Sequence, residues 1–294
     1  MTKHTDRGSL FQSRKFTDWA TVKEALIARE VDAVFLLAPM AMRLRQDDVP
    51  IKVVYLGHRD GTAIMVGADS DIRSVQDLRG KVCAIPSRFA NQNLLMHKLM
   101  KDAGMPYDSI ELREVPPPEH PSALRSGSID AYIVGEPFAA QSEMDGYGRV
   151  LYLTKDIWPD FISCVLVVHE ELIEENRELV QEMVDGIAKS GKWLDEGEDG
   201  GLAHRMDAAE VAAKHYYGQN PDLLKFVLSK PMDRVKYTQL GPLKPDFDEI
   251  MELGVEIGIL DGPIAFEEYA DDSFAKPVDE IDWGFDRLPG TGEQ

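Results

Sequence analysis

Apolar and polar positions follow one another along the chain in blocks that predict helices and strands in turn. Residues 20–29 carry apolar side chains at helical spacing, and an unbroken apolar run, residues 33–42, follows at once. The first pattern predicts an amphipathic helix, and the second predicts a buried strand that ends in a turn at Pro39. Residues 51–57 and 62–67 predict two further strands.

The same alternation continues through the middle of the chain. Strands are predicted at 81–86, 110–115, 129–135, 150–155 and 164–172, and helices at 91–104, 122–127, 171–217, 221–228 and 245–257. Gly104 is a typical helix stop signal. Strands that alternate with helices in this way indicate the α/β class.

One phrase occurs twice, about a hundred residues apart. REVDAVFLLAPM (29–40) and GSIDAYIVGEPF (127–138) share an acid–Ala pair, a short apolar run and a proline at the same spacing. The repeat predicts the same strand entry and Pro-ended loop in two separate lobes, with a ligand cleft where the carboxyl ends of the strands face each other. The alternative is that acid–Ala before apolar residues is merely a common strand entry.

Length and charge narrow the function classes. The 294 residues suit about two domains or one large one, and the net charge of −20 comes from 52 acidic against 32 basic residues. Binding to nucleic acid or to an anionic membrane needs clustered Lys and Arg, so neither partner is expected. The simpler interpretation is that the negative charge keeps the protein surface soluble and makes copies of the protein repel one another.

The cysteines and the N-terminus carry few signals. Cys83 and Cys164 lie inside apolar runs, which favours buried free thiols over a disulfide or a nucleophile. No metal-ligand spacing such as CxxC or HExxH occurs, so neither a metal nor another cofactor is expected. The N-terminus does not resemble a signal peptide, and no run of 18 apolar residues, the length of a membrane-spanning helix, occurs. Both observations predict a cytoplasmic address if the chain as given is complete.

Three segments together carry a family resemblance. WATVKEALIAREVDAVFLLAPMAM, VPPPEHPSALRSGSIDAYIVGEPFAAQ and YLTKDIWPDFISCVLVVHEEL resemble the solute-binding proteins of ABC importers for nitrate, bicarbonate and sulfonates, and most of all the nitrate- and bicarbonate-binding branch. The resemblance spans roughly residues 16–196. It implies a type II periplasmic-binding-protein-like fold with two α/β lobes around a central cleft, permease and ATPase subunits as partners, and a periplasmic or membrane-associated address.

The resemblance also implies a division into lobes. Residues 1–74 and 168–294 would form lobe I, and residues 75–167 would form lobe II. Family members start with a further strand and helix that carry ligand contacts. The resemblance implies that the sequence as given lacks them, either because its start is truncated or because the lobe is trimmed. An unpaired sheet edge left by that gap would favour weak dimerisation, so a monomer or a weak dimer is expected.

The family's anion-binding positions are only partly kept. Its Trp is present as Trp19, its Gln falls near Thr62, its His near Gln92, and its Lys at Cys164. The Lys supplies a fixed positive charge, and an unpaired anion is costly to bury. Nitrate and bicarbonate are therefore disfavoured, and a small organic anion is expected instead.

Arg88 is the candidate replacement for the lost charge. It precedes a predicted helix, so it can offer a bidentate donor to a carboxylate, sulfonate or phosphate. The expected neighbours of the ligand, at the same strand edges or loop, are Pro39, Ser87, Asn91, Gly135 and Glu136. The alternatives for Glu136 are that it binds a cationic group or caps a loop. The simpler alternative for Arg88 is a solvated loop residue, because Arg is mostly exposed.

Two other functions stay open at this stage. A cleft enzyme on the same scaffold, like a thiamin-pyrimidine synthase or a cysteine-dependent desulfinase, would use Cys164 as nucleophile. That role requires a base or a positive environment, which the neighbouring sequence does not supply. A cytoplasmic ligand-sensing domain is the other alternative. The leading hypothesis is a non-enzymatic binding protein that captures its ligand by hinge closure.

Overall fold

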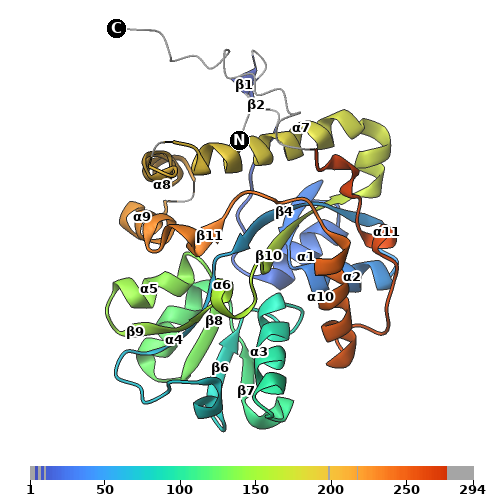
Figure 1. The fold of residues 1–294 in the computed structure, drawn as a ribbon. Helices are drawn as coiled ribbons and strands as arrows, with labels where there is room; N and C mark the ends of the chain where they lie inside the picture. Colours follow the sequence, from blue (N-terminus) through green and yellow to red (C-terminus); the bar gives the residue numbers. More distant parts are fainter. Residues whose placement is uncertain (1–3, 6–7, 10, 198, 217, 277–294) are drawn as a thin grey trace, which may run out of the picture.

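The computed structural model describes residues 4–5, 8–9, 11–197, 199–216 and 218–276. Two sheets, each covered by helices, form an upper and a lower lobe in Figure 1. This is the predicted α/β architecture. A short pair, β1 (His4–Thr5) and β2 (Gly8–Ser9), lies apart from both sheets.

The first lobe is built on an antiparallel sheet of four strands. In spatial order these are β11 (Val235–Lys236), β4 (Ile51–Asp60), β10 (Ile162–His169) and β3 (Ala33–Leu36). Its helices are α1 (Trp19–Ile27), α2 (Ala38–Gln46), α7 (Glu170–Asp195), α10 (Lys244–Glu256) and α11 (Phe266–Tyr269). In Figure 1, α7 runs along the top of this lobe.

The second lobe is built on a mixed sheet of five strands. In spatial order these are β7 (Glu111–Glu114), β6 (Val82–Ile85), β8 (Ala131–Gly135), β5 (Thr62–Gly67) and β9 (Gly148–Leu153). Strand β6 runs parallel to β7 and β8, whereas β5 is antiparallel to β8 and β9. Its helices are α3 (Asn91–Asp102), α4 (His120–Ser126), α5 (Phe138–Met144) and α6 (Thr154–Ile157).

Two more helices extend from the first lobe toward the second. Helix α8 (Leu202–His215) follows α7, and α9 (Pro221–Ser229) packs against both α8 and α5. A short 3₁₀ turn, η4 (Met232–Arg234), then leads back to β11. None of the helices in the described ranges is long and apolar enough to cross a membrane.

The chain crosses between the two sheets at two points that lie side by side. The first is Asp60–Gly61 and the second is Phe161–Ile162, and the Asp60 amide donates to the Phe161 carbonyl at 2.7 Å. The lobe ranges expected from the sequence, with a change at residues 74/75 and 167/168, do not coincide with these crossings. The expected ranges assign β5 to lobe I, but it joins the sheet of the second lobe. They assign most of β10 to lobe II, but it joins the sheet of the first lobe.

The repeated phrase forms a strand followed by a helix in each lobe, although β3 is an edge strand and β8 is central in its sheet. The first copy forms β3 and the second forms β8, and a helix follows each. The turn predicted at Pro39 is wrong, because the strand ends at Leu36 and Pro39 lies in α2, which begins at Ala38. Residues 36–42 are all buried and apolar, so no polar position there reveals the helical period, and Pro39 occupies the first helical turn, where its missing N–H costs nothing.

The two lobes are in direct contact. Ala90 and Leu94, from the start of α3 in the second lobe, belong to the same buried apolar cluster as the core of the first lobe. Ion pairs also connect α3 with α10, including Lys98 with Glu249 at 3.1 Å. The region between the lobes is therefore formed by side chains from both of them.

Candidate ligand-binding groove

A groove of about 570 Å³ lies between the lobes. One wall comes from α1 and α2 of the first lobe, and the other from residues 86–89 and 114–116 of the second lobe. Most of its lining is apolar, including Trp19, Ile27, Met40, Leu44, Phe89 and Val115. This size and lining are typical of sites for small organic molecules.

Trp19 is held in the groove by the cap of α1. The Asp18 carboxylate accepts hydrogen bonds from the Thr21 amide and hydroxyl, each at 2.8 Å, which starts the helix at Trp19. The same amide bond lowers the pKa of Asp18 below 3.8. The indole Nε1 of Trp19 is buried and has no hydrogen-bond partner among the described residues. The indole N–H of Trp19 is therefore a hydrogen-bond donor without an acceptor among the described residues.

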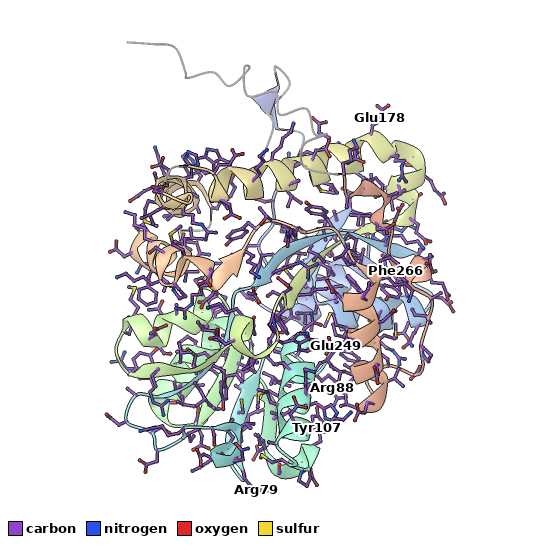
Figure 2. All side chains as sticks on the ribbon, viewed as in Figure 1. Arg79, Arg88, Tyr107, Glu178, Glu249 and Phe266 are labelled. Carbon is purple, nitrogen blue, oxygen red and sulfur yellow. The ribbon has the colours of Figure 1, made fainter. Side chains whose placement is uncertain are left out.

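The loop that carries Arg88 is fixed by its neighbours. Ser87 Oγ accepts from the Phe89 amide at 3.2 Å, and Asn93 Nδ2 donates to the Arg88 carbonyl at 2.8 Å. Tyr107 in turn donates its hydroxyl to Asn93 Oδ1 at 2.8 Å. Figure 2 shows Arg88 and Tyr107 beside α3. The Arg88 backbone is therefore set in place, while its side chain is 67% exposed in the groove.

Both arginines that line the groove are paired with carboxylates. The Arg88 amide donates to Glu114 Oε2 at 2.9 Å, and the Arg88 guanidinium Nε lies 3.6 Å from Glu114 Oε1. Arg43 pairs with Asp47 at 2.8 Å on the opposite wall. An incoming charged group would therefore compete with a carboxylate for either guanidinium.

Other predicted ligand-binding residues form a buried polar seam where the lobes meet. Gln92 Nε2 donates to Thr62 Oγ1 at 3.3 Å, and Asn91 Nδ2 donates to the Ile162 carbonyl. A Cβ at Gly135 would lie 3.7 Å from Ser163 Oγ and 3.9 Å from Thr62 Oγ1. The seam does not line the groove; Asn91 instead lines a separate cavity of about 140 Å³.

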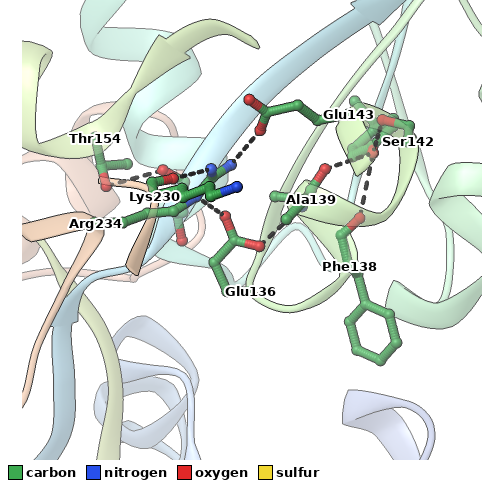
Figure 3. A network of polar contacts seen from close by, with 11 residues as sticks. Glu136, Phe138, Ala139, Ser142, Glu143, Thr154, Lys230 and Arg234 are labelled. Carbon is green, nitrogen blue, oxygen red and sulfur yellow. Dashed lines mark hydrogen bonds and ion pairs between the residues drawn. The ribbon is translucent and has the colours of Figure 1, made fainter. Parts of the chain in front are cut away.

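Glu136 is buried and its carboxylate is already bound. Oε1 accepts from Arg234 Nε at 2.5 Å, and Oε2 accepts from the Ala140 amide at 2.8 Å (Figure 3). Arg234 also donates to Glu143 at 2.9 Å. Glu136 lines neither the groove nor the small cavity, so the structure gives it a structural contact where the sequence predicted a ligand contact.

Cys164 also lies away from the groove. Its Sγ fills the space beside Gly57 and Phe35 on one face of the first sheet. Burial raises the pKa of the Cys164 thiol to about 12, and burial likewise raises that of Cys83 to about 12. A thiol in this state is not a nucleophile near neutral pH.

Of the ten predicted residues, the structure brings Trp19, Ser87 and Arg88 together in the groove. Pro39 is buried in α2, next to Met40, which does line the groove. Sequence reasoning missed Glu114, although its place at the end of the strand predicted over 110–115 was a usable signal for it. Within the described ranges, no group of three or more His, Cys, Asp or Glu residues could hold a metal ion.

The sequence profile of the NMT1-like family matches residues 3–213, which is well over half of the chain. The chain belongs to the NMT1-like family. Proteins similar in sequence to this chain include ones named as nitrate-, bicarbonate- and taurine-binding proteins. The resemblance stated from the sequence is thus confirmed.

Individual relatives agree with this assignment. The nitrate import ATP-binding protein NrtC of Synechocystis sp. is 23% identical over 229 residues, which cover 71% of this chain and 33% of NrtC. The chain spans about a third of the length of that relative. The zinc-bound ligand-binding component of an ABC-type import system from Staphylococcus aureus has a TM-score of 0.78 and 26% identity, over 91% of this chain and 87% of that one.

An enzyme shares the fold at lower similarity. The structure of DSZB in complex with biphenyl-2-sulfinic acid has a TM-score of 0.61 and 14% identity, over 85% of this chain and 86% of that one. At this identity the likeness concerns the fold alone. The scaffold is therefore shared by binding proteins and by an enzyme, and the chemistry has to be argued from the residues of the site.

Proposed function

We propose that this protein is the solute-binding component of an ABC-type importer and that it captures a small organic anion between its lobes. The observation that carries the proposal is the groove, because both lobes supply its walls and Arg88 extends into it. A ligand that contacts both walls favours the closed arrangement of the lobes. The permease and ATPase subunits of an importer are the proposed partners, and the periplasm or the outer membrane face is the proposed location.

The ligand class follows from the lining of the groove. Nitrate and bicarbonate are compact anions that need several polar donors around them, whereas this groove is mostly apolar and encloses about 570 Å³. The residue aligned with the family's Lys is Cys164, which is half-buried and uncharged. An organic body against Trp19 and Phe89, with an acidic head near Arg88 and Ser87, suits the groove better.

The enzyme alternative has less support. It needs Cys164 as a thiolate beside the substrate, and Cys164 lies outside the groove with its pKa raised to about 12. A ligand-sensing domain would use the same groove and differ only in its partner. A pull-down with detergent-solubilised importer subunits, with and without ligand, distinguishes the sensor from the importer component.

A thermal-shift screen of the purified chain tests the proposal. The compounds are nitrate, bicarbonate, alkyl- and arylsulfonates, small carboxylates and pyrimidines. At a hundredfold excess over its dissociation constant, a ligand adds about 2.7 kcal/mol to the free energy of unfolding. We expect an organic anion to raise the melting temperature, and we expect Arg88→Ala to lose that shift.

A matched arginine serves as control. Arg79 is exposed and lies at the base of the second lobe in Figure 2, away from the groove lining. Arg79→Ala should keep the full shift. A shift with nitrate or bicarbonate that survives in Arg88→Ala would refute the ligand class, and an absence of any shift across the panel would refute solute capture in this groove.

A further inference from the structure

Glu114 occupies the position that a ligand anion would take on Arg88. Its Oε2 accepts the Arg88 amide at 2.9 Å, its Oε1 lies 3.6 Å from the Arg88 guanidinium Nε, and both side chains line the groove. We propose that Glu114 is a specificity-determining residue, an internal carboxylate that an anionic ligand must displace from Arg88. The inference rests on the proposed function of the groove.

The backbone register places Glu114 in this position. Strand β7 runs parallel to β6, with Glu114 opposite Ile85, and the Val115 amide donates to the Ile85 carbonyl at 3.0 Å. Arg88 follows Ile85 by three residues in the next loop. Both residues therefore stand at the carboxyl edge of the same parallel pair, where ligands bind in open α/β sheets. The carboxylate is held there by sheet pairing and not only by its attraction to Arg88.

The exposure of the pair decides what Glu114 does to a ligand. The Glu114 side chain is 51% exposed and that of Arg88 is 67% exposed, so water screens their attraction and displacement is not costly. The displaced carboxylate nevertheless stays at the groove, where it repels any anion that binds. An acceptor that makes two strong bonds to Arg88 overcomes this repulsion, whereas a weak acceptor does not. An uncharged ligand is indifferent to it.

Isothermal titration calorimetry with two isosteric probes tests this inference. Benzenesulfonate carries the negative charge, and benzenesulfonamide has the same shape without it. We expect Glu114→Gln to bind benzenesulfonate roughly twofold to fivefold more tightly than the unaltered protein at low ionic strength. The gain should fade in high salt, because charge repulsion is screened. The affinity for benzenesulfonamide should not change.

Two further variants make the test specific. Glu111 lies on the same strand and pairs with Arg113 at 2.6 Å, outside the groove lining, so Glu111→Gln removes one charge from the same strand without touching the site. It should leave both affinities unchanged. In Arg88→Ala, the further change Glu114→Gln should give only the part of the gain that comes from lost repulsion, because no guanidinium is left to release.

The outcomes separate the inference from the proposed function. If Arg88→Ala loses benzenesulfonate but Glu114→Gln binds it no more tightly than the unaltered protein, the inference is overturned and the groove still binds anions. An equal gain in Glu111→Gln would also overturn it, because the effect would then be one of net charge. If neither the unaltered protein nor Glu114→Gln binds benzenesulfonate, the inference fails; the proposed function fails only if the thermal-shift panel is silent as well.

Discussion

Arg234 Nε lies 2.5 Å from Glu136 Oε1, across 98 residues of sequence. Arg234 ends η4, just before the first sheet, and Glu136 follows β8 of the second sheet, so the pair ties the C-terminal part of the first lobe to the second lobe (Figure 3). Both side chains are almost fully buried, at 1% and 4% exposure. A second carboxylate, that of Glu143, lies 2.9 Å from Arg234 Nη2.

Removal of either partner of this pair should destabilise the fold. In Glu136→Gln or Arg234→Met, a buried charge loses its main partner, and we expect the free energy of unfolding to fall by about 3–5 kcal/mol. The double variant should lose less than the sum of the two single variants. Urea unfolding of all four proteins measures this coupling.

An exposed ion pair is the control for this cycle. Glu111 and Arg113 are 59% and 46% exposed, and their coupling should be below about 1 kcal/mol. Equal coupling energies in the two cycles would show that burial does not strengthen the Arg234–Glu136 pair.

The contribution of Asp60, at the first crossing between the lobes, to the free energy of unfolding should change with pH in the opposite direction from that of a typical carboxylate. Its side chain is 0% exposed, Lys236 Nζ is 3.5 Å away, and burial raises its pKa above 3.8. A raised pKa means that the stabilising contribution is present below the unfolded value and is lost as pH rises through the folded value. We expect Asp60→Asn to raise the free energy of unfolding at pH 7, because the buried charge is removed.

Asparagine is a suitable replacement because the backbone φ at Asp60 is 56°, a region that Asn and Asp tolerate. Urea titrations of both proteins at pH 7 and pH 3 provide the measurement. The difference should shrink at pH 3, where Asp60 is protonated in both states. Lower stability of Asp60→Asn at pH 7 would mean that attraction to Lys236 outweighs burial.

Asp18 should show the ordinary acid dependence. The Thr21 amide lowers its pKa, so its contribution is present above the unfolded value of 3.8 and is lost as pH falls through the lower folded value. Asp18→Ala should cost about 1 kcal/mol at pH 7, because α1 loses its N-cap. Asp18→Asn keeps a capping oxygen and should cost less, without the acid dependence. Denaturant unfolding between pH 2.5 and 7 measures both effects, and equal costs for the two variants would argue against the cap.

Neither cysteine should react with iodoacetamide in the native protein at pH 7. Burial raises the pKa of both Cys83 and Cys164 to about 12, so almost no thiolate forms. Mass spectrometry of the native chain should show no adduct, and the urea-unfolded chain should show two. Rapid native labelling at Cys164 would revive the enzyme alternative.

Local signals in the sequence determined the order of the helices and strands and the strand-then-helix unit that the two lobes share. The acid–Ala phrase predicted β3 and β8, and Gly104 predicted the end of α3, where φ is 64°. These features depend on contacts within a few residues, which the sequence displays directly. The switch from β3 to α2 was missed because burial removes the polar positions that would reveal the period.

Pairing between distant segments was decided only by the tertiary structure. Nothing in the composition of residues 62–67 or 162–167 says which sheet each strand joins, because either strand could bury its apolar side chains in either sheet. The same holds for the site: Arg88 was predicted from its place before a helix, but its partner Glu114 is 26 residues away and reaches it through the register of β6 and β7. The burial of Glu136 against Arg234 likewise depends on how the two lobes pack, which no local pattern records.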